Sequence, residues 1–359
     1  MVPKIDCAKC SSCGLCVDVC PVKNNDSVED ITDKDVYALW SKTENLRLLS
    51  TSGGVASSIS FKLLMENYAT VGAVYSRDYT RVFHEYCDTI YKIFDTIGSK
   101  YVQSNFSIGF KKALSDKNNK YVIFGTPCQI IGAKNVLKKL QIDELNYYLI
   151  DFFCHGIPSY ILWKAFIDDL NSKVGRIYSL NLRFKDTDWH EFKIRAIGKN
   201  GVYLKKFSKD PFGKLYLSNY CLRNTCYTCR FNKFSAADIR IGDFWGEFYE
   251  ENKMGVSIVL PITEKGFDLI IKSKDIEVES VPSNYLFGSQ LIKEGKRFPV
   301  PPNNDKVLED LKKGLSLKAI YKIYFFKNDI KRLPLKLVKG LLPKKYIKFV
   351  KKAIRWIRK

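Results

Sequence analysis

The stretch Tyr121-Val122-Ile123-Phe124-Gly125-Thr126-Pro127-Cys128 contains the pattern that decides the fold. Its first four residues are apolar and favour β-structure, which is typical of a buried strand. Thr126 is a good helix N-cap and proline is favoured at the first helical position, so we predict a helix that continues to about Leu140. Cys128 then lies in the first turn of this helix, where backbone amides and the helix dipole favour a thiolate.

The same arrangement recurs one unit later in the chain. Residues 147–152 (YYLIDF) indicate a second buried strand, and a helix is predicted from Tyr160 after the segment Cys154-His155-Gly156-Ile157-Pro158-Ser159. If the two strands are parallel neighbours, Cys128 and Cys154 emerge at the same carboxyl edge of the sheet, where open α/β folds place their functional sites. Short β-rich runs alternate with helical patterns along the chain, so the predicted fold class is α/β.

Near the N-terminus, the run Cys10-x2-Cys13-x2-Cys16-x3-Cys20-Pro21 has the spacing that wraps short turns around a 4Fe–4S cluster. Disulfides would require an oxidising compartment, and the first residues contain no apolar signal segment. A zinc site would normally combine two CxxC pairs separated by a longer loop. We therefore predict a 4Fe–4S cluster here. Cys20 is the leading choice for its fourth ligand, and Cys7 or a remote thiolate are the alternatives.

The two cysteines at the predicted sheet edge need partners, and the segment Cys226-Tyr227-Thr228-Cys229 supplies a close pair. Taken alone, Cys128 and Cys154 would be interpreted as unreactive core cysteines. Cys226 and Cys229 would be interpreted as a dithiol or as half of a zinc site. Cys87 and Cys221 lack such a context and are predicted to be core or peripheral residues. Our preferred interpretation is that a second 4Fe–4S cluster is ligated by Cys128, Cys154, Cys226 and Cys229.

A glycine-containing turn, Ser50-Thr51-Ser52-Gly53-Gly54-Val55, precedes a predicted helix over residues 56–64. Glycines let backbone amides approach a ligand closely, and a helix start adds positive potential, so the turn suits a phosphate group. As a local pattern, however, serine and glycine before a helix more often form a simple cap.

The composition is that of an ordinary globular protein, with 46% hydrophobic and 27% charged residues among 359. No stretch approaches the roughly 18 uninterrupted apolar residues that span a bilayer. The formal net charge of +21 is concentrated at one end of the chain. Residues 311–359 include 17 Lys or Arg and one acid, Asp329, and carry +16, whereas the rest of the chain carries +5. The body of the protein is only mildly basic, and no nucleic-acid partner is expected.

Residues 346–359 have the periodicity of an amphipathic helix, because apolar and cationic side chains separate onto opposite halves at about 100° per residue. This pattern suits peripheral contact with an anionic membrane surface, and docking on the protein's own domain is an equal alternative. The aromatic residues lie on the apolar half, which disfavours RNA binding. The apolar half comprises Tyr346, Ile347, Phe349, Val350, Ala353, Ile354, Trp356 and Ile357, and the cationic half Lys348, Lys351, Lys352, Arg355, Arg358 and Lys359.

In their order, these motifs resemble the beta subunit of coenzyme F-420-reducing hydrogenases and dehydrogenases, a family of iron–sulfur flavoproteins. The resemblance covers residues 10–268. It is carried by the N-terminal cysteine run, the TSGG turn at 51–54, SKYVQS at 99–104, GTPCQ at 125–129, CHGIPS at 154–159, LRNTCYTC at 222–229 and GDFWG at 242–246.

The resemblance implies a small N-terminal ferredoxin-like cluster module followed by a mixed α/β flavin-binding domain. The expected divisions are residues 1–30 for the 4Fe–4S module, 31–145 for the first flavin-binding region, 146–300 for the region with the second cluster motif, and 301–359 for the basic tail. The implied cofactors are FAD and one or two 4Fe–4S clusters. The FAD pyrophosphate is expected near Ser52, Gly53 and Gly54, with Lys100 and Gln103 as further flavin contacts.

By the same resemblance, the chain is expected to be an oxidoreductase that passes electrons between 4Fe–4S clusters and FAD. Hydride would be exchanged with a deazaflavin or another hydride carrier, and electrons with a ferredoxin or a partner subunit. His155 and Asp243 lie in matching motifs without an assigned catalytic role. Two departures are that only one ferredoxin-type run is present and that residues 183–189 follow the family pattern loosely.

Two alternatives come from other functional classes. The chain would be a non-catalytic electron-relay subunit of a larger, membrane-associated complex if it lacked flavin, or a zinc-binding interaction protein if it retained zinc rather than iron. A cytoplasmic location is expected, with the inner face of the membrane as the contact in the lipid interpretation of the tail.

Deletion of residues 346–359 tests the interpretation of the tail. If the amphipathic segment binds lipid, the truncated chain loses its binding to anionic vesicles while its cofactors stay in place. Vesicle sedimentation with iron and flavin assays on the same samples measures both quantities. Sedimentation that is the same with and without the segment would eliminate the membrane interpretation.

Overall fold

The computed structural model describes residues 5–116, 119–291 and 298–325. The amphipathic segment predicted at 346–359 lies outside the described residues. Within the described residues, no helix is both long enough and apolar enough to cross a membrane.

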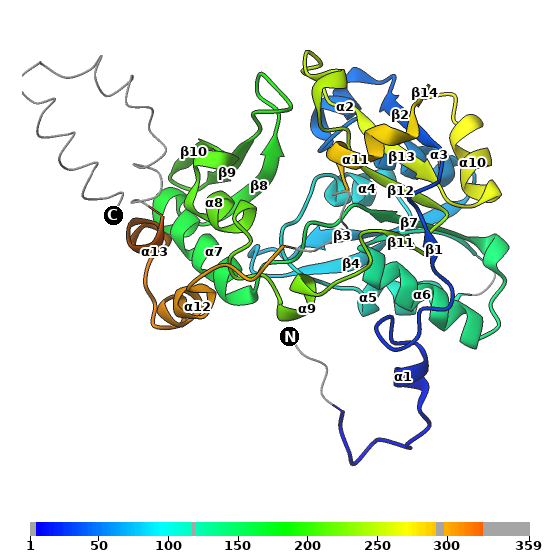
Figure 1. The fold of residues 1–359 in the computed structure, drawn as a ribbon, viewed down its shortest axis with the longest axis horizontal. Coiled ribbons are helices and arrows are strands. Elements are labelled where there is room, and N and C mark those ends of the chain that lie inside the picture. Colours follow the sequence, from blue (N-terminus) through cyan, green and yellow to red (C-terminus); the bar gives the residue numbers. More distant parts are fainter. Residues whose placement is uncertain (1–4, 117–118, 292–297, 326–359) are drawn as a thin grey trace, which may run out of the picture.

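The elements alternate between strands and helices along most of the chain, as the sequence predicts (Figure 1). The helices are α1 (Leu15–Asp18), α2 (Glu44–Leu49), α3 (Val55–Met65), α4 (Ile90–Thr96), α5 (Ser107–Ser115), α6 (Pro127–Lys139), α7 (Tyr160–Val174), α8 (Pro211–Leu217), α9 (Asn224–Tyr227), α10 (Glu264–Ile271), α11 (Leu286–Ser289), α12 (Asn304–Lys312) and α13 (Leu317–Tyr324). The strands are β1 (Glu29–Asp30), β2 (Val36–Ser41), β3 (Tyr68–Tyr75), β4 (Val82–Cys87), β5 (Ser104–Asn105), β6 (Lys120–Gly125), β7 (Tyr147–Phe152), β8 (Ile177–Phe184), β9 (Lys193–Gly198), β10 (Gly201–Lys206), β11 (Phe234–Ser235), β12 (Ile239–Asp243), β13 (Ser257–Pro261) and β14 (Ile276–Val281).

A nine-stranded mixed sheet forms the centre of the molecule, in the order β14-β2-β13-β12-β7-β6-β3-β4-β5. Its four central strands, β12, β7, β6 and β3, run parallel to one another, and antiparallel strands flank them. The carboxyl ends of these four strands therefore meet at one edge of the sheet. This edge is where such folds place their functional sites.

Side chains that alternate along the central strands build an apolar layer on each face of the sheet. In β6, Val122 points into the layer covered by α3 and α10, whereas Tyr121 and Ile123 point into the layer covered by α5 and α6. All three residues are fully buried. The continuous apolar run in the sequence is thus explained by burial of β6 on both faces.

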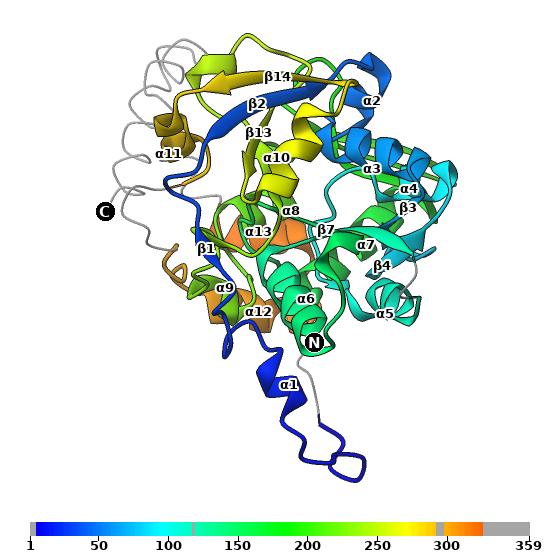
Figure 2. The same cartoon turned by 90° about the vertical axis from the view of Figure 1, so that its right-hand side faces the viewer.

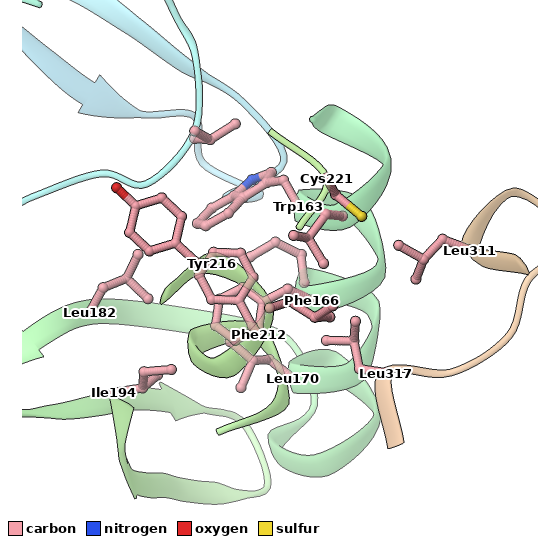
Figure 3. Close-up of a cluster of buried hydrophobic side chains, with 14 of the residues drawn as sticks. Trp163, Phe166, Leu170, Leu182, Ile194, Phe212, Tyr216, Cys221, Leu311 and Leu317 are labelled. Carbon is pink, nitrogen blue, oxygen red and sulfur yellow. The ribbon is translucent and has the colours of Figure 1, made fainter. Parts of the chain in front are cut away.

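A second lobe consists of the antiparallel sheet β10-β9-β8 packed against α7, α8, α12 and α13 (Figure 1). Its core is centred on Trp163, Phe166 and Phe212 (Figure 3). The Phe166 and Phe212 rings stack with their centroids 4.2 Å apart. Leu311, Leu317 and other residues of α12 and α13 also belong to this core, so the described beginning of the predicted basic tail is packed into the protein.

The N-terminal cysteine segment extends away from the central sheet (Figures 1 and 2). Among its described residues the only helix is α1, and the segment returns to the body through β1, which pairs antiparallel with β11. The sequence predicts a small cluster module at this position, and a short cysteine-rich segment outside the central sheet fits such a module. The wider division into regions at 31–145 and 146–300 stays a prediction, since the central sheet takes strands from both.

The predicted elements around the two sheet-edge cysteines are confirmed. β6 ends at Gly125, and the first cysteine, Cys128, lies in the first turn of α6, which Pro127 opens and for which Thr126 and Gln129 form a capping box. α7 begins at Tyr160, and the Ser159 hydroxyl caps it by accepting a hydrogen bond from the Leu162 amide.

Candidate functional site

The parallel pairing of β6 and β7 places two cysteines at the same carboxyl edge of the sheet. Gly125 at the end of β6 is the register partner of Asp151 in β7. Cys128 and Cys154 each lie three residues beyond this pair, so the predicted shared edge is confirmed. Both cysteines are partly buried.

The loop that precedes the CxxC pair interlocks with the loop that follows Cys154. Pro158 and Leu222 form an isolated antiparallel bridge. The Ser159 amide donates to the Cys221 carbonyl at 2.7 Å, and the Arg223 amide donates to the Ile157 carbonyl at 2.9 Å. These bonds bring α9, which contains Cys226, to the same edge as Cys154.

Contacts of the four predicted ligands show that they share one neighbourhood. Cys128 and Cys229 pack against the same small apolar cluster of Ile131, Phe231 and Ala236. Burial raises the pKa of the Tyr216 hydroxyl well above its ordinary value, and the nearby thiols of Cys154 and Cys226 raise it further. The structure therefore gathers all four residues, although within the described residues no three Cys, His, Asp or Glu side chains are arranged to hold a metal ion.

Burial and neighbouring groups act in opposite directions on the pKa of the Cys128 thiol. Burial raises its pKa, and the nearby thiols of Cys229 and Cys226 add to this effect. The Thr126 hydroxyl, 3.2 Å from the sulfur, and the Arg223 guanidinium act in the opposite direction but do not outweigh burial. Loss of hydration is therefore the largest effect on the pKa of this sulfur.

A fully buried ion pair supports the CxxC loop from the side of the sheet. Both nitrogen-to-oxygen distances between Arg240 in β12 and Asp151 in β7 are 2.6 Å, and neither side chain is exposed. The same guanidinium donates to the carbonyls of Phe231, Asn232 and Phe234, which follow Cys229 closely. Arg240 thereby fixes the chain after Cys229 relative to the strand that leads to Cys154.

The N-terminal cysteine segment is attached along α6, the helix that begins beside Cys128. Asn135 is buried and donates to the Asn24 carbonyl at 2.9 Å and to the Val19 carbonyl at 3.5 Å. Gly132 lies against Pro21, the residue after Cys20. Because an α-helix rises about 1.5 Å per residue, Gly132 is only about 6 Å along the axis from Cys128.

The cysteines of the N-terminal run are themselves accessible. Cys7, Cys10, Cys13 and Cys16 are exposed and Cys20 is partly exposed. The Leu15 backbone amide and the Ser11 side chain lower the pKa of the Cys13 thiol, which favours the thiolate that a metal ligand requires. The choice among Cys20, Cys7 and a remote thiolate as fourth ligand stays a prediction.

In the TSGG turn, the two glycines have different roles. A Cβ atom on Gly53 would lie 2.4 Å from the Leu39 carbonyl oxygen, so the glycine permits close packing against β2. Its amide donates to the Ser257 hydroxyl at 3.1 Å. Gly54 is the N-cap of α3 and has a φ of 84°, a left-handed conformation that favours glycine.

A buried lysine fastens this turn to the neighbouring loop, and no sequence pattern indicates it. The Lys185 ammonium donates to the carbonyls of Ser52 at 2.5 Å, Met254 at 2.6 Å and Arg47 at 2.7 Å. Burial lowers the pKa of Lys185 to about 7, although the Asp243 carboxylate raises it. The hydrogen bonds of Lys185 therefore connect the turn to the chain at Arg47 and Met254.

The two further flavin candidates, Lys100 and Gln103, lie at different places on one segment. The Lys100 ammonium donates to the carbonyls of Asp95, Thr96 and Ile97 at the end of α4, at 3.1, 2.7 and 2.9 Å. Burial lowers its pKa to about 7. The Gln103 side chain instead accepts a hydrogen bond from Arg223, directly before the helix that contains Cys226.

Residues 99–104 therefore link the glycine turn to the cysteine loops. At one end, the Ser99 amide donates to the hydroxyl of Thr51, the first residue of the TSGG turn, at 2.9 Å. At the other end, Gln129 donates to the Ser104 hydroxyl at 3.0 Å, one residue after Cys128. The candidate flavin and cluster residues are thus connected by six residues of chain.

An arginine–aspartate pair lies beside this segment. Arg183 is 5% exposed and binds both carboxylate oxygens of Asp243, at 2.9 and 3.1 Å. Its guanidinium also lies 3.9 Å from the centre of the Phe192 ring and 5.3 Å from that of Trp245. Although burial alone would lower the pKa of Arg183, Asp243 and Tyr101 outweigh it and raise that pKa. Asp243 thus orders the site through Arg183, a residue whose role the loosely matching segment 183–189 did not indicate.

An open cleft of about 600 Å³ lies at the opposite, amino-terminal edge of the sheet. Tyr148 at the start of β7, Lys62 of α3 and Lys265 of α10 contribute to its lining. None of the predicted site residues lines it.

Comparison with known proteins agrees with the motifs. Residues 118–283 match the family described as the C terminus of the coenzyme F420 hydrogenase/dehydrogenase beta subunit, which confirms the resemblance. A chain in the xenon-derivatized F420-reducing NiFe hydrogenase complex from Methanosarcina barkeri has a similar fold, with a TM-score of 0.50. The two chains are 16% identical over 84% of this chain and 94% of that one. No curated protein matches the chain.

The packing of Gly53 leads to a stability prediction. Gly53→Ala places a methyl group against the backbone of Leu39 and Ser257, and we expect it to lower the free energy of unfolding by about 1–3 kcal/mol in urea denaturation. Gly132→Ala is the matched control, since nothing lies within 3.7 Å of its added Cβ and alanine favours the helix. Equal stability of the two variants would refute the packing role.

Arg240 leads to a second prediction. Arg240→Met leaves the Asp151 carboxylate buried without its partner, so we expect a loss of about 3–5 kcal/mol in the free energy of unfolding. Arg176→Met, which changes an exposed arginine, should stay within about 0.5 kcal/mol of the parent. The double variant Asp151→Leu/Arg240→Met should recover part of the loss, and an undiminished loss would contradict the ion-pair explanation.

Proposed function

Because residues 118–283 belong to the coenzyme F420 hydrogenase/dehydrogenase beta-subunit family, we propose that this oxidoreductase chain is an iron–sulfur flavoprotein that passes electrons between 4Fe–4S clusters and FAD. The observation that supports this most is the position of residues 99–104. Ser99 bonds to Thr51 of the TSGG turn. Gln103 bonds to Arg223, before the helix of Cys226, and Ser104 bonds to Gln129, the residue after Cys128. A flavin and a cluster held at the two ends of this segment would be neighbours.

The second cluster would be held by thiolates on three segments of chain. Apolar side chains pack against Cys128 and Cys229, and Arg240 supports the loop after Cys229 from the side of the sheet. Thiolate ligands suit iron–sulfur clusters, and burial and nearby hydrogen bonds set the potential of such a cluster. The proposed ligands are Cys128, Cys154, Cys226 and Cys229.

The N-terminal cluster would be held by Cys10, Cys13, Cys16 and Cys20 on the exposed segment. Its exposure suits exchange of electrons with a partner, which we propose to be a ferredoxin or a partner subunit. The contacts of Gly132 and Asn135 along α6 hold this segment close to Cys128. α6 thus contains Cys128 of the second set and contacts the residues that follow the N-terminal run.

FAD would lie near Ser52, Gly53 and Gly54, and would supply exchange between two-electron hydride chemistry and one-electron transfer. The chain would orient it through the N-terminus of α3, whose amides suit a phosphate group. We propose a deazaflavin as the hydride carrier, since the structurally similar complex is named as F420-reducing. The activity is proposed to be cytoplasmic.

One observation favours the alternative of an electron relay without flavin. The Gly53 amide, the Ser52 hydroxyl and the Lys100 ammonium all donate to acceptors within the chain, at 3.1, 2.7 and 2.7–3.1 Å. A flavin that used these donors would have to replace such bonds. Flavin content therefore separates the enzyme from the relay.

Cysteine variants of the anaerobically reconstituted chain test the proposal. Cys154→Ser and Cys13→Ser should each remove about four irons per chain, from different clusters, while FAD is retained. Cys87→Ala changes a buried cysteine of β4 outside both sets and should keep the full iron content. Iron, sulfide and flavin assays with electron paramagnetic resonance measure the outcome. Iron content that Cys154→Ser leaves unchanged would refute the second cluster.

A further inference from the structure

The loop that leads into the CxxC pair is held from outside by one buried asparagine. Asn304, the first residue of α12, is 4% exposed. Its Oδ1 atom accepts a hydrogen bond from the Cys221 amide at 2.7 Å, and the Tyr227 hydroxyl lies 3.3 Å from the same oxygen. One side chain thus contacts both the loop and the helix that contains Cys226.

The loop requires such support because its backbone is unusual. Asn219 and Cys221 have φ values of 63° and 57°, in the left-handed region that costs a non-glycine residue roughly 1 kcal/mol or more. The Tyr227 hydroxyl donates to the Asn219 carbonyl at 2.6 Å and accepts from the Leu222 amide at 3.2 Å. Asn304 and Tyr227 together satisfy the polar groups that this conformation turns inward.

The shape of this loop determines where Cys226 lies. The residue that Asn304 holds, Cys221, accepts the hydrogen bond from Ser159, and Arg223 bonds to Ile157. The Cys226 amide in turn donates to the Arg223 carbonyl at 2.8 Å. Hydrogen bonds therefore connect Asn304, through Cys221 and Arg223, to the backbone of Cys226 and to the loop that follows Cys154.

Asn304 is itself firmly anchored. Val307, Leu311 and Leu317 are buried in the core of the second lobe, where Leu311 and Leu317 point toward α7 (Figure 3). The Tyr220 hydroxyl donates to the Pro302 carbonyl at 2.8 Å. All of α12 lies beyond residues 118–283, so the anchor comes from outside the part of the chain that matches the family.

We propose that Asn304 is a positioning residue for the four-cysteine site, because it fixes residues 219–223 and so sets Cys226 and Cys229 opposite Cys128 and Cys154. This inference rests on the second cluster of the proposed function. It assigns the region after residue 300 a part in building that site. Asn304 acts through the loop, by its contacts with Cys221 and Tyr227.

Hydrogen exchange tests the first half of the proposal without any cofactor. In the metal-free full-length chain, Asn304→Ala should speed exchange of the amides in residues 219–223 by at least about tenfold, since it removes the acceptor of Cys221. Exchange in α7 should stay unchanged and serves as the internal measure of global stability. Unchanged exchange in residues 219–223 would overturn the proposal.

Cluster content tests the second half. After anaerobic reconstitution with iron and sulfide, Asn304→Ala should lose at least half of the iron of the second cluster or change its reduction potential, with the N-terminal cluster unaffected. Asn304→Asp keeps an acceptor oxygen, and a carboxylate is favourable at the start of a helix, so this variant should restore both loop protection and iron. Asn171→Ala, at an exposed position of α7, is the matched control.

The outcomes distinguish this inference from the proposed function. If the unmodified chain binds no second cluster, the proposed function fails, and the exchange experiment still decides whether Asn304 holds the loop. If the unmodified chain binds two clusters and Asn304→Ala binds both with unchanged potentials, the positioning role is refuted. Faster loop exchange together with selective loss of the second cluster, both reversed by Asn304→Asp, would establish it.

Discussion

The buried ion pair between Asp151 and Arg240 is the interaction on which the arrangement of the site most depends. It lies at the carboxyl edge of the parallel strands, where β7 ends and the loop of Cys154 begins. A buried charge is tolerated only when it is paired and hydrogen-bonded, and here the guanidinium satisfies two carboxylate oxygens and three loop carbonyls. Because these carbonyls follow the CxxC pair, the cost of burying the charge is offset only when that loop is in place. The sheet and the cysteine loops are therefore stable together.

Around this edge, the chain brings three distant parts of the sequence into contact. The N-terminal cysteine segment lies along α6, the glycine turn is connected through residues 99–104, and the CxxC loop is held by Arg240 on one side and Asn304 on the other. Each connection uses buried polar side chains with defined partners. Such contacts fix geometry more narrowly than apolar packing does, which would suit the proposed clusters and flavin, since electron transfer between them needs fixed separations.

The sequence predicted the local elements around the site well. The pattern from Tyr121 to Cys128 specified a strand, a capped helix and a cysteine at its start, because burial and capping act over a few residues. The neighbouring positions of Cys128 and Cys154 followed from the rule for parallel strands.

The roles of Lys185, Arg240 and Asn304 were not predictable, because each depends on partners that are distant in sequence. Burial, which raises the pKa of the Cys128 thiol, was not predictable either, because it depends on the tertiary fold. The close packing of Gly53 was also not predictable, because its close neighbours belong to β2 and β13.

The central claim is that the described scaffold holds two clusters and a flavin. The measurement that tests it most directly is a combined assay of iron, sulfide, zinc and flavin on the full chain purified without oxygen. The account predicts about eight irons, eight sulfides and one FAD per chain, with negligible zinc. Zinc in place of iron would contradict the account entirely, and eight irons without FAD after reconstitution would contradict the flavoenzyme and leave an electron relay.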